Sequence, residues 1–443
     1  MPRTRLWKVA VALILHMPCA MLPGQGTTDK SPAGPTVAAT GEILGELEPC
    51  GCTPGQLGGL GRRLSYLRSL REQGVQPVVV DNGDLVARCG RQAEVKVEIL
   101  SMAMAAMGYT ACNVGERDLR MGLAFLRQIQ EASRLPFVAA NVVDGEGQTV
   151  FPPYHVVCPS ANAAAAKVGI TGILSERFRR DIEGNPDGLR IADPVKALKR
   201  IIPDLRKQCG HIVLLSHCPQ KESITLAQRF PEIALIVSGH DRQDPIPPDR
   251  VGNTLVVTTG WKGKNLIVCT LNNGDPQSRI VPLTDELAEV PEMTQLMSFY
   301  KDMVRSERLL DAVPARTAIG KFAGYRPCLD CHEKEYRSWQ VTEHAHAYES
   351  LKKKDYHHDP ECVGCHTIGF RLATGFRTPD ATPRKANVGC ECCHGPCRAH
   401  IREAQKKVKS RWEPPTKRTC LQCHTHERSP GFDYERCRDK VRH

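Results

Sequence analysis

Four copies of one short pattern lie in the C-terminal part of the chain. Each has two cysteines separated by two residues and a histidine directly after the second cysteine. This spacing is the attachment signature of c-type heme, because both sulfurs and the histidine must reach one macrocycle. The sequence therefore predicts four covalent hemes, held by Cys328, Cys331 and His332, by Cys362, Cys365 and His366, by Cys390, Cys393 and His394, and by Cys420, Cys423 and His424.

Other chemistries of cysteine fit this pattern less well. Zinc sites and thioredoxin-like dithiols use paired cysteines, but they do not need a histidine after each second one. Disulfides would be normal for 20 cysteines in an exported protein, yet 11 of the 16 histidines also lie after residue 315. Apolar runs are rare in this region, so the porphyrins themselves would have to form its core.

Most of the positive charge lies in the same region. From residue 315 onward there are 25 Lys and Arg against 16 Asp and Glu, which is a surplus of 9 within the total of +11. Charge of this density could bind nucleic acid. The two propionates of each heme would be a local partner for it, so we expect no nucleic-acid binding.

The region from 324 to 443 resembles the tetraheme cytochromes c that accept electrons from hydroxylamine oxidation. The resemblance rests on "CLDCHEKEYRSWQVTEHAHAYESL", "ECVGCHTIGF", "NVGCECCHGPCRAH" and "CLQCHTHERSPGFDYERCRDKVRH". It implies that His344, His400 and His443 bind irons from the distal side, with His346 as the main rival of His344. Three distal ligands for four irons would leave one heme five-coordinate.

Two cysteines of the third motif's neighbourhood, Cys392 and Cys397, remain outside the attachment pattern. A disulfide between them and two free thiols fit the sequence equally well. Another pair, Cys50 and Cys52, flanks one glycine near the start of the chain and could bind a soft metal, form a redox pair or bond elsewhere.

The chain ahead of the heme motifs must form a different kind of domain. From Thr40 to about Pro282, apolar strand-like runs such as "PVVVDNGD", "YTACNVGE", "KVGITGIL", "HIVLLSH" and "ALIVSGH" alternate with helical patterns. That alternation predicts a layered α/β fold. In such folds, chemical groups lie in loops at the carboxyl ends of the strands.

Residues 37 to 285 resemble the metallophosphoesterase domain of exported 5'-nucleotidases, through "TGEILGELEP", "VVVDNGDL", "NVGERDL", "AANVVD", "VLLSHCPQ" and "IVSGHDR". That family holds two metal ions, which activate water and clamp a phosphate. The resemblance matches Asp84 to the bridging ligand and His217 and His240 to ligands of one metal. Glu116 replaces that metal's asparagine and keeps an oxygen ligand.

The second metal position has lost its ligands. Glu42 replaces its aspartate, Leu44 and Arg242 replace its histidines, and Arg117 replaces the catalytic histidine. Leucine has no donor atom, and a guanidinium has no lone pair to offer a metal. We therefore expect at most one divalent ion (Zn, Mn or Fe), held by Asp84, Glu116, His217 and His240, and disfavour hydrolase activity. A wholly vestigial site is the alternative.

The remaining segments complete the predicted organisation. Residues 1–26 have Arg and Lys ahead of a short apolar run, which is typical of a secretory signal and predicts a periplasmic or otherwise exported protein. No apolar run reaches the ~20 residues of a membrane span. A lipid anchor on Cys19 is disfavoured because "HMPC" lacks a small residue before the cysteine. Three-and-four apolar spacing predicts a helical connector over 286–314.

The predicted fold class is thus an α/β layered metallophosphoesterase-like domain (37–285) followed by a heme-packed, mostly helical or irregular tetraheme cytochrome c domain (315–443). The leading hypothesis for function is an exported electron carrier that exchanges electrons with redox partners and uses its first domain for docking or for one metal. A heme enzyme acting on a small nitrogen, sulfur or oxygen species is the second hypothesis. A metal-dependent phosphoesterase with a cytochrome appendage is the third.

Overall fold

The computed structural model describes residues 34–49, 55–159, 167–240, 243–272, 274–408 and 414–442. The predicted signal segment with Cys19, the Cys50 and Cys52 pair, Arg242 and the distal ligand His443 lie outside the described residues. The chain divides into two compact units, and the boundary falls between Met297 and Ser298. Among the described residues, no helix has the length and apolar character needed to cross a bilayer.

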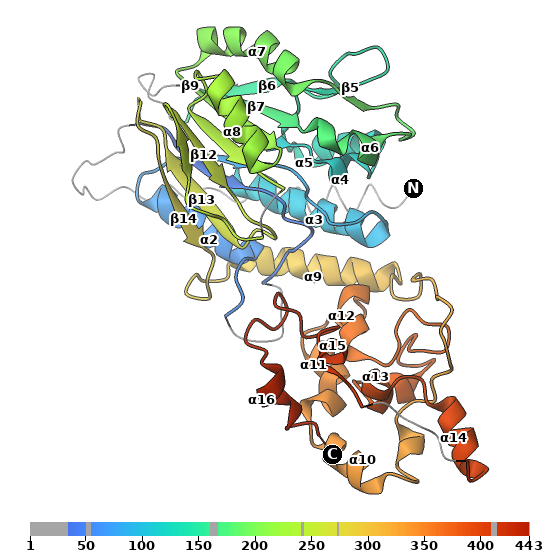
Figure 1. The fold of residues 1–443 in the computed structure, drawn as a ribbon. Helices are drawn as coiled ribbons and strands as arrows, with labels where there is room; N and C mark the ends of the chain where they lie inside the picture. The colour runs from blue at the N-terminus through green and yellow to red at the C-terminus, as the bar shows by residue number, and fades with distance from the viewer. Residues whose placement is uncertain are drawn as a thin grey trace. The chain divides into compact units, whose positions relative to one another are not determined.

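Two six-stranded sheets form the N-terminal unit (Figure 1). The first sheet has the order β14-β13-β1-β2-β3-β4, and its strands are Gln277–Pro282, Asn265–Thr270, Thr36–Thr40, Val78–Asp81, Tyr109–Asn113 and Phe137–Val138. The second has the order β11-β12-β10-β9-β7-β6, with Asp249–Val251, Thr254–Thr258, Leu235–Ser238, His211–His217, Val168–Leu174 and Tyr154–Val157. In each sheet four adjacent strands run parallel, β1 to β4 in the first and β12, β10, β9 and β7 in the second, so their carboxyl ends meet at one edge.

The apolar faces of the two sheets form the main core. Alternate residues such as Val78 and Val80 of β2 and Val213 and Leu215 of β9 belong to one buried cluster, which matches the two-residue period of a strand. The other face of β9, with Ile212 and Leu214, packs in a second cluster beneath helices. The predicted layered α/β fold is confirmed.

Helices cover the outer faces of this sandwich. Helix α7 (Pro194–Gln208) contacts β6, β7 and β9, and α8 (Gln220–Arg229) contacts β10 to β12. Helix α7 begins where its sequence predicts, because Asp193 accepts hydrogen bonds from the Val195 and Lys196 amides and proline takes the first helical position. On the other sheet, α3 (Arg91–Met107) packs on β3, and α2 (Leu60–Glu72) and α5 (Leu123–Ser133) pack on α3.

Short helices and loops make up the C-terminal unit, which begins within α9 (Pro291–Ser306). Its apolar cluster contains six buried residues, Leu310, Tyr348, Leu351, Val363, Phe370 and Phe376. The main cluster of the N-terminal unit contains 17. The predicted mostly helical or irregular character of this region is confirmed; its helices after α9 are α10 (Glu333–Gln340), α11 (Ala347–Lys353), α12 (Pro360–His366), α13 (Cys390–His394), α14 (Arg398–Gln405), α15 (Lys417–Cys420) and α16 (Tyr434–Arg438).

Candidate functional site

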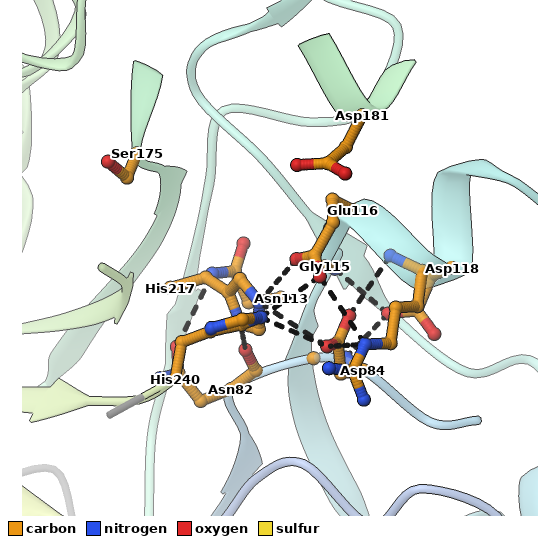
Figure 2. A network of polar contacts seen from close by, with 12 residues as sticks. Asn82, Asp84, Asn113, Gly115, Glu116, Asp118, Ser175, Asp181, His217 and His240 are labelled. Atoms are coloured by element: carbon orange, nitrogen blue, oxygen red, sulfur yellow. Dashed lines mark hydrogen bonds and ion pairs between the residues drawn. The ribbon is translucent and has the colours of Figure 1, made fainter. Parts of the chain in front are cut away.

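Four polar side chains meet at the carboxyl ends of the parallel strands of the N-terminal unit. Asp84 follows β2, Glu116 opens the short helix α4 (Glu116–Leu119) after β3, His217 ends β9, and His240 follows β10. Both sheets therefore contribute two residues each. These are the four residues that the sequence proposed as ligands of one metal, and Figure 2 shows them pointing toward one another.

The donor atoms of these four side chains lie within 4.8 Å of one another. The two oxygens of Glu116 are each 2.9 Å from a histidine Nε2, one on His217 and one on His240. The Oδ2 atom of Asp84 is 3.7 Å and 3.8 Å from the same two nitrogens. Two imidazoles and two carboxylates around one point form a ligand set that suits zinc, manganese or iron.

Neighbouring groups orient these donors. The Nδ1 atom of His217 is 2.9 Å from the carbonyl oxygen of Asn82, so Nδ1 donates there and Nε2 faces the cluster. The buried Oδ2 of Asp84 accepts no hydrogen bond from any described residue. The Arg117 guanidinium forms an ion pair with this oxygen at 3.2 Å, so the fit to a bound cation rests on the two imidazoles and two carboxylates that converge on one point.

The backbone is strained at the same place. Asp84 and His240 have φ angles of 58° and 73°, and Glu42 and Leu44 have 49° and 55°. Residues other than glycine seldom adopt this left-handed region, and such strain gathers at functional sites. Gly115 is required here, because a Cβ atom would lie 2.1 Å from Oδ1 of Asp84.

Asp118 holds the two ligand loops together, a role that sequence reasoning missed. Its carboxylate accepts hydrogen bonds from the backbone amides of Asp84, Leu85 and Gly115, each at 2.8 Å. The only sequence signal was its position two residues after Glu116. The ring of Phe178, also not predicted, lies 4.4 Å from the His240 ring and 5.7 Å from the His217 ring.

The protonation of each side chain in the cluster depends on the charges of the others. Burial alone would lower the pKa of His217, but the Asp84 and Glu116 carboxylates outweigh it and raise the pKa to about 10. Burial would raise the pKa of Glu116, yet its hydrogen bonds to His217 and His240 lower it below its usual range. Without a metal, a proton on His217 therefore balances the carboxylates.

Two of the residues that the resemblance matches to the second metal position, Arg117 and Glu42, lie beside the four-residue cluster. The Nε atom of Arg117 lies 3.2 Å from Oδ2 of Asp84 and 3.4 Å from Oε1 of Glu116. The side chain of Glu42 is buried and accepts a hydrogen bond from the backbone of His240. The guanidinium of Arg117 compensates part of the negative charge of both carboxylates.

The four attachment motifs lie on short helices or the turns beside them. The histidine of the second motif is oriented by the backbone, because Nδ1 of His366 lies 2.6 Å from the carbonyl oxygen of Ala347. In the fourth motif, Nδ1 of His424 lies 3.2 Å from Oγ of Ser429. The His424 ring stacks on Phe432 with a centroid separation of 4.4 Å. In both His366 and His424, the contact at Nδ1 fixes the orientation of the ring, as iron ligation through Nε2 requires.

Two of the predicted distal histidines lie opposite motif histidines. The ring centroids of His332 and His400 are 6.2 Å apart, and those of His344 and His424 are 6.0 Å apart. Metal–nitrogen bonds of about 2.0 Å on both sides of one iron would put two imidazole centroids roughly 6 Å apart. Both separations therefore fit two axial ligands of one iron, whereas His346, the rival of His344, is exposed.

The attachment cysteines gather in two groups. Cys328 of the first motif is hydrogen-bonded to Cys390 of the third. Cys365 of the second is hydrogen-bonded to Cys423 of the fourth. The motifs are thus neighbours in two pairs, first with third and second with fourth.

Cys392 and Cys397, the two extra cysteines beside the third motif whose pairing the sequence left open, form no disulfide in the structure. Cys392 contacts the carbonyl oxygen of Thr367, and Cys397 contacts the carboxylate of Glu391.

Comparison with known proteins matches the C-terminal and the N-terminal regions to two different groups of proteins. Residues 327–395 match the family described as "Cytochrome c554 and c-prime". Cytochrome c-554 of Nitrosomonas europaea is 37% identical over 117 residues, which cover 23% of this chain and 49% of that protein. The 2',3'-cyclic-nucleotide 2'-phosphodiesterase/3'-nucleotidase of Yersinia enterocolitica is 27% identical over 208 residues, which cover 41% of this chain and 32% of that protein.

Among solved structures, the 5'-nucleotidase precursor from Thermus thermophilus matches with a TM-score of 0.53 and 22% identity, covering 64% of this chain and 61% of that one. This likeness concerns the fold. The chain spans about half of the cytochrome relative and about one third of the nucleotidase relative. The chain thus joins an N-terminal α/β region that resembles 5'-nucleotidases and calcineurin-like phosphoesterases to a C-terminal region that resembles the multiheme c-type cytochromes of the cytochrome c554 group.

Proposed function

We propose that this protein is an exported multiheme c-type cytochrome that carries electrons through four covalently bound hemes. The observation that carries the proposal is the pairing of His332 with His400 and of His344 with His424 at separations suited to one iron between each pair. Iron with two imidazole ligands has no open position for a substrate. Such irons pass electrons, which favours electron transfer over chemistry at these two hemes.

The grouping of the attachment cysteines supports a route for the electrons. If hemes are attached at these cysteines, the nearness of Cys328 to Cys390 and of Cys365 to Cys423 would bring the edges of two porphyrins together in each group. Hemes attached in this way would lie close enough to exchange electrons within a group. Soluble or membrane redox proteins would then serve as the donor and acceptor at the surface.

The N-terminal region would act as a single-metal module. Asp84, Glu116, His217 and His240 would hold one divalent ion, which would supply Lewis acidity when bound. Arg117 would repel a second cation from the vacated position, and Leu44 offers it no ligand. The module would therefore dock a redox partner or bind a ligand at its metal, and it would not hydrolyse phosphoesters rapidly.

A second candidate function is metal-dependent hydrolysis of a phosphoester, as the similarity to nucleotidases suggests. The converging donor atoms of the four side chains favour it. The Arg117 guanidinium beside Asp84 and Glu116 opposes it, because two-metal hydrolysis needs a cation with an exchangeable water at that place. Turnover of nucleotides at ordinary enzyme rates by the purified protein would favour this candidate over the first.

A reductive titration of the purified holoprotein, followed by its optical spectrum, tests the proposed function. Four electrons per chain are expected to be taken up at heme before the spectrum stops changing. Uptake of no electrons, or uptake only at a non-heme centre, would reject an electron carrier of this kind. Export would be tested by finding the mature chain outside the cytoplasm and without residues 1–26.

A further inference from the structure

A buried carboxylate lies inside the third attachment motif, where heme binding does not use it. Glu391 is the residue between Cys390 and Cys392, and its side chain is only 2% exposed. Acidic residues are seldom buried to this degree unless they are paired. Lys385 lies within electrostatic range of this carboxylate, but no side-chain cation of the described residues lies within the 4.0 Å of an ion pair with it.

Hydrogen-bond donors surround this carboxylate instead. Its oxygens accept from the backbone amides of Ala323 at 2.9 Å, Gly324 at 2.7 Å and Cys397 at 2.8 Å. The thiol of Cys397 donates to Oε1 at 3.1 Å. Glu391 therefore accepts from four donors, two on the segment 323–324 and two on Cys397, as an ionised carboxylate, a pure acceptor, can do.

The charge lies close to two heme attachment points. Glu391 follows Cys390 directly, and Cys328 of the first motif is hydrogen-bonded to both Cys390 and Cys397. The Cys397 thiol contacts both Glu391 and Cys328, so a charge on Glu391 lies near the Cys328 and Cys390 sulfurs and would act on both. Such effects are large in a buried site, because little water screens them.

We propose that Glu391 sets the reduction potential of the hemes attached through Cys328 and Cys390, and that the Cys397 thiol moderates its charge. Oxidised heme iron carries one more positive charge than reduced iron, so a buried anion beside it stabilises the oxidised state. Burial and hydrogen bonding around a heme are the levers by which a protein adjusts its potential. This inference rests on the proposed function, because it needs the hemes to be attached.

The test is a spectroelectrochemical titration of the holoprotein and its variants, after heme has been counted in each. Glu391→Gln keeps the shape of the side chain and removes its charge. We expect the potentials of the first and third hemes to rise, with a tenfold change in the one-electron reduction constant, or about 59 mV. Asp330→Asn is the matched control, since Asp330 lies in the first motif but is exposed.

Cys397→Ala gives a second arm with the opposite sign. It removes one donor from the carboxylate and concentrates the charge, so the same two potentials should fall. Unchanged potentials in Glu391→Gln with four hemes bound would overturn the proposal, and so would an equal rise in Asp330→Asn. If Glu391→Gln does not retain its hemes, Cys397→Ala decides, and an absence of any fall would overturn it. A wild-type protein without four hemes would instead reject the proposed function.

Discussion

The two regions of this chain differ in how much apolar core their own side chains form. In the N-terminal region, 17 buried residues from two sheets form one continuous apolar cluster, and a second cluster lies under the helices. The C-terminal region buries a cluster of six and consists of short helices joined by loops. A small apolar cluster contributes little stability. The difference leads us to expect that the first region folds from its own side chains, whereas the second needs bound heme to complete its core.

The largest expected effect comes from withholding heme. Full-length protein made without cytochrome maturation should fold over residues 37–285 and remain largely unfolded over 315–443. Limited proteolysis followed by mass spectrometry of the fragments would measure this. A heme-free protein whose C-terminal region resists protease as well as its N-terminal region would break the comparison.

Removing one distal ligand should change one heme and leave the fold in place. His344→Ala is expected to convert about one heme per chain from low spin to high spin, because His344 faces His424 at 6.0 Å. His346→Ala is the matched control, since it lies two residues away and is exposed. Electron paramagnetic resonance would count the spins. Equal effects of the two variants would contradict the assigned ligand pair.

In the N-terminal region, the corresponding test removes a ligand of the metal. Glu116→Gln should weaken binding of zinc or manganese by at least about 100-fold, since even residues that only support a ligand are worth 10- to 100-fold. Asp181→Asn provides the control, because Asp181 lies near the cluster in Figure 2 but pairs with Arg120. Isothermal titration calorimetry would compare them. If both variants bind metal as the wild type does, the site is vestigial.

The smallest effect is a dependence of metal binding on pH. Burial opposes protonation of His217, but Asp84 and Glu116 raise the pKa of its metal-free form to about 10. Metal must therefore displace a proton, and its apparent affinity should rise by about tenfold per pH unit below that pKa. The measurement is a metal titration at several pH values with a matched buffer ionisation enthalpy. An affinity that is flat or falls with rising pH would show that His217 is not a ligand.

Sequence patterns were informative where one segment determines the outcome. The strands "VVVD" and "HIVLLSH" are apolar runs that must be buried, and each is a central strand, β2 and β9. Strand β14 was not predicted, because it lies at a sheet edge with mostly exposed or half-buried residues and has no clear alternation. Strand β13 is a buried run, "NLIVCT", which the same reasoning should have included.

The candidate sites likewise contain residues that local sequence identifies and residues that only tertiary contacts reveal. The residue types of Asp84, Glu116, His217 and His240 and the strand ends that carry them can be read from the chain, and the structure brings all four together. Asp118 could not be found, because its partners are backbone amides of loops more than 30 residues apart. The pairing of His332 with His400 likewise depends on tertiary contact, about which motif spacing carries no information.

The central claim is that four hemes are covalently attached to the C-terminal region. Mass spectrometry of intact protein from a host that matures c-type cytochromes, combined with metal analysis, tests it most directly. The account predicts a mass equal to the mature polypeptide plus four hemes, with four irons at heme per chain. An unmodified polypeptide that carries zinc at the cysteine motifs would contradict it.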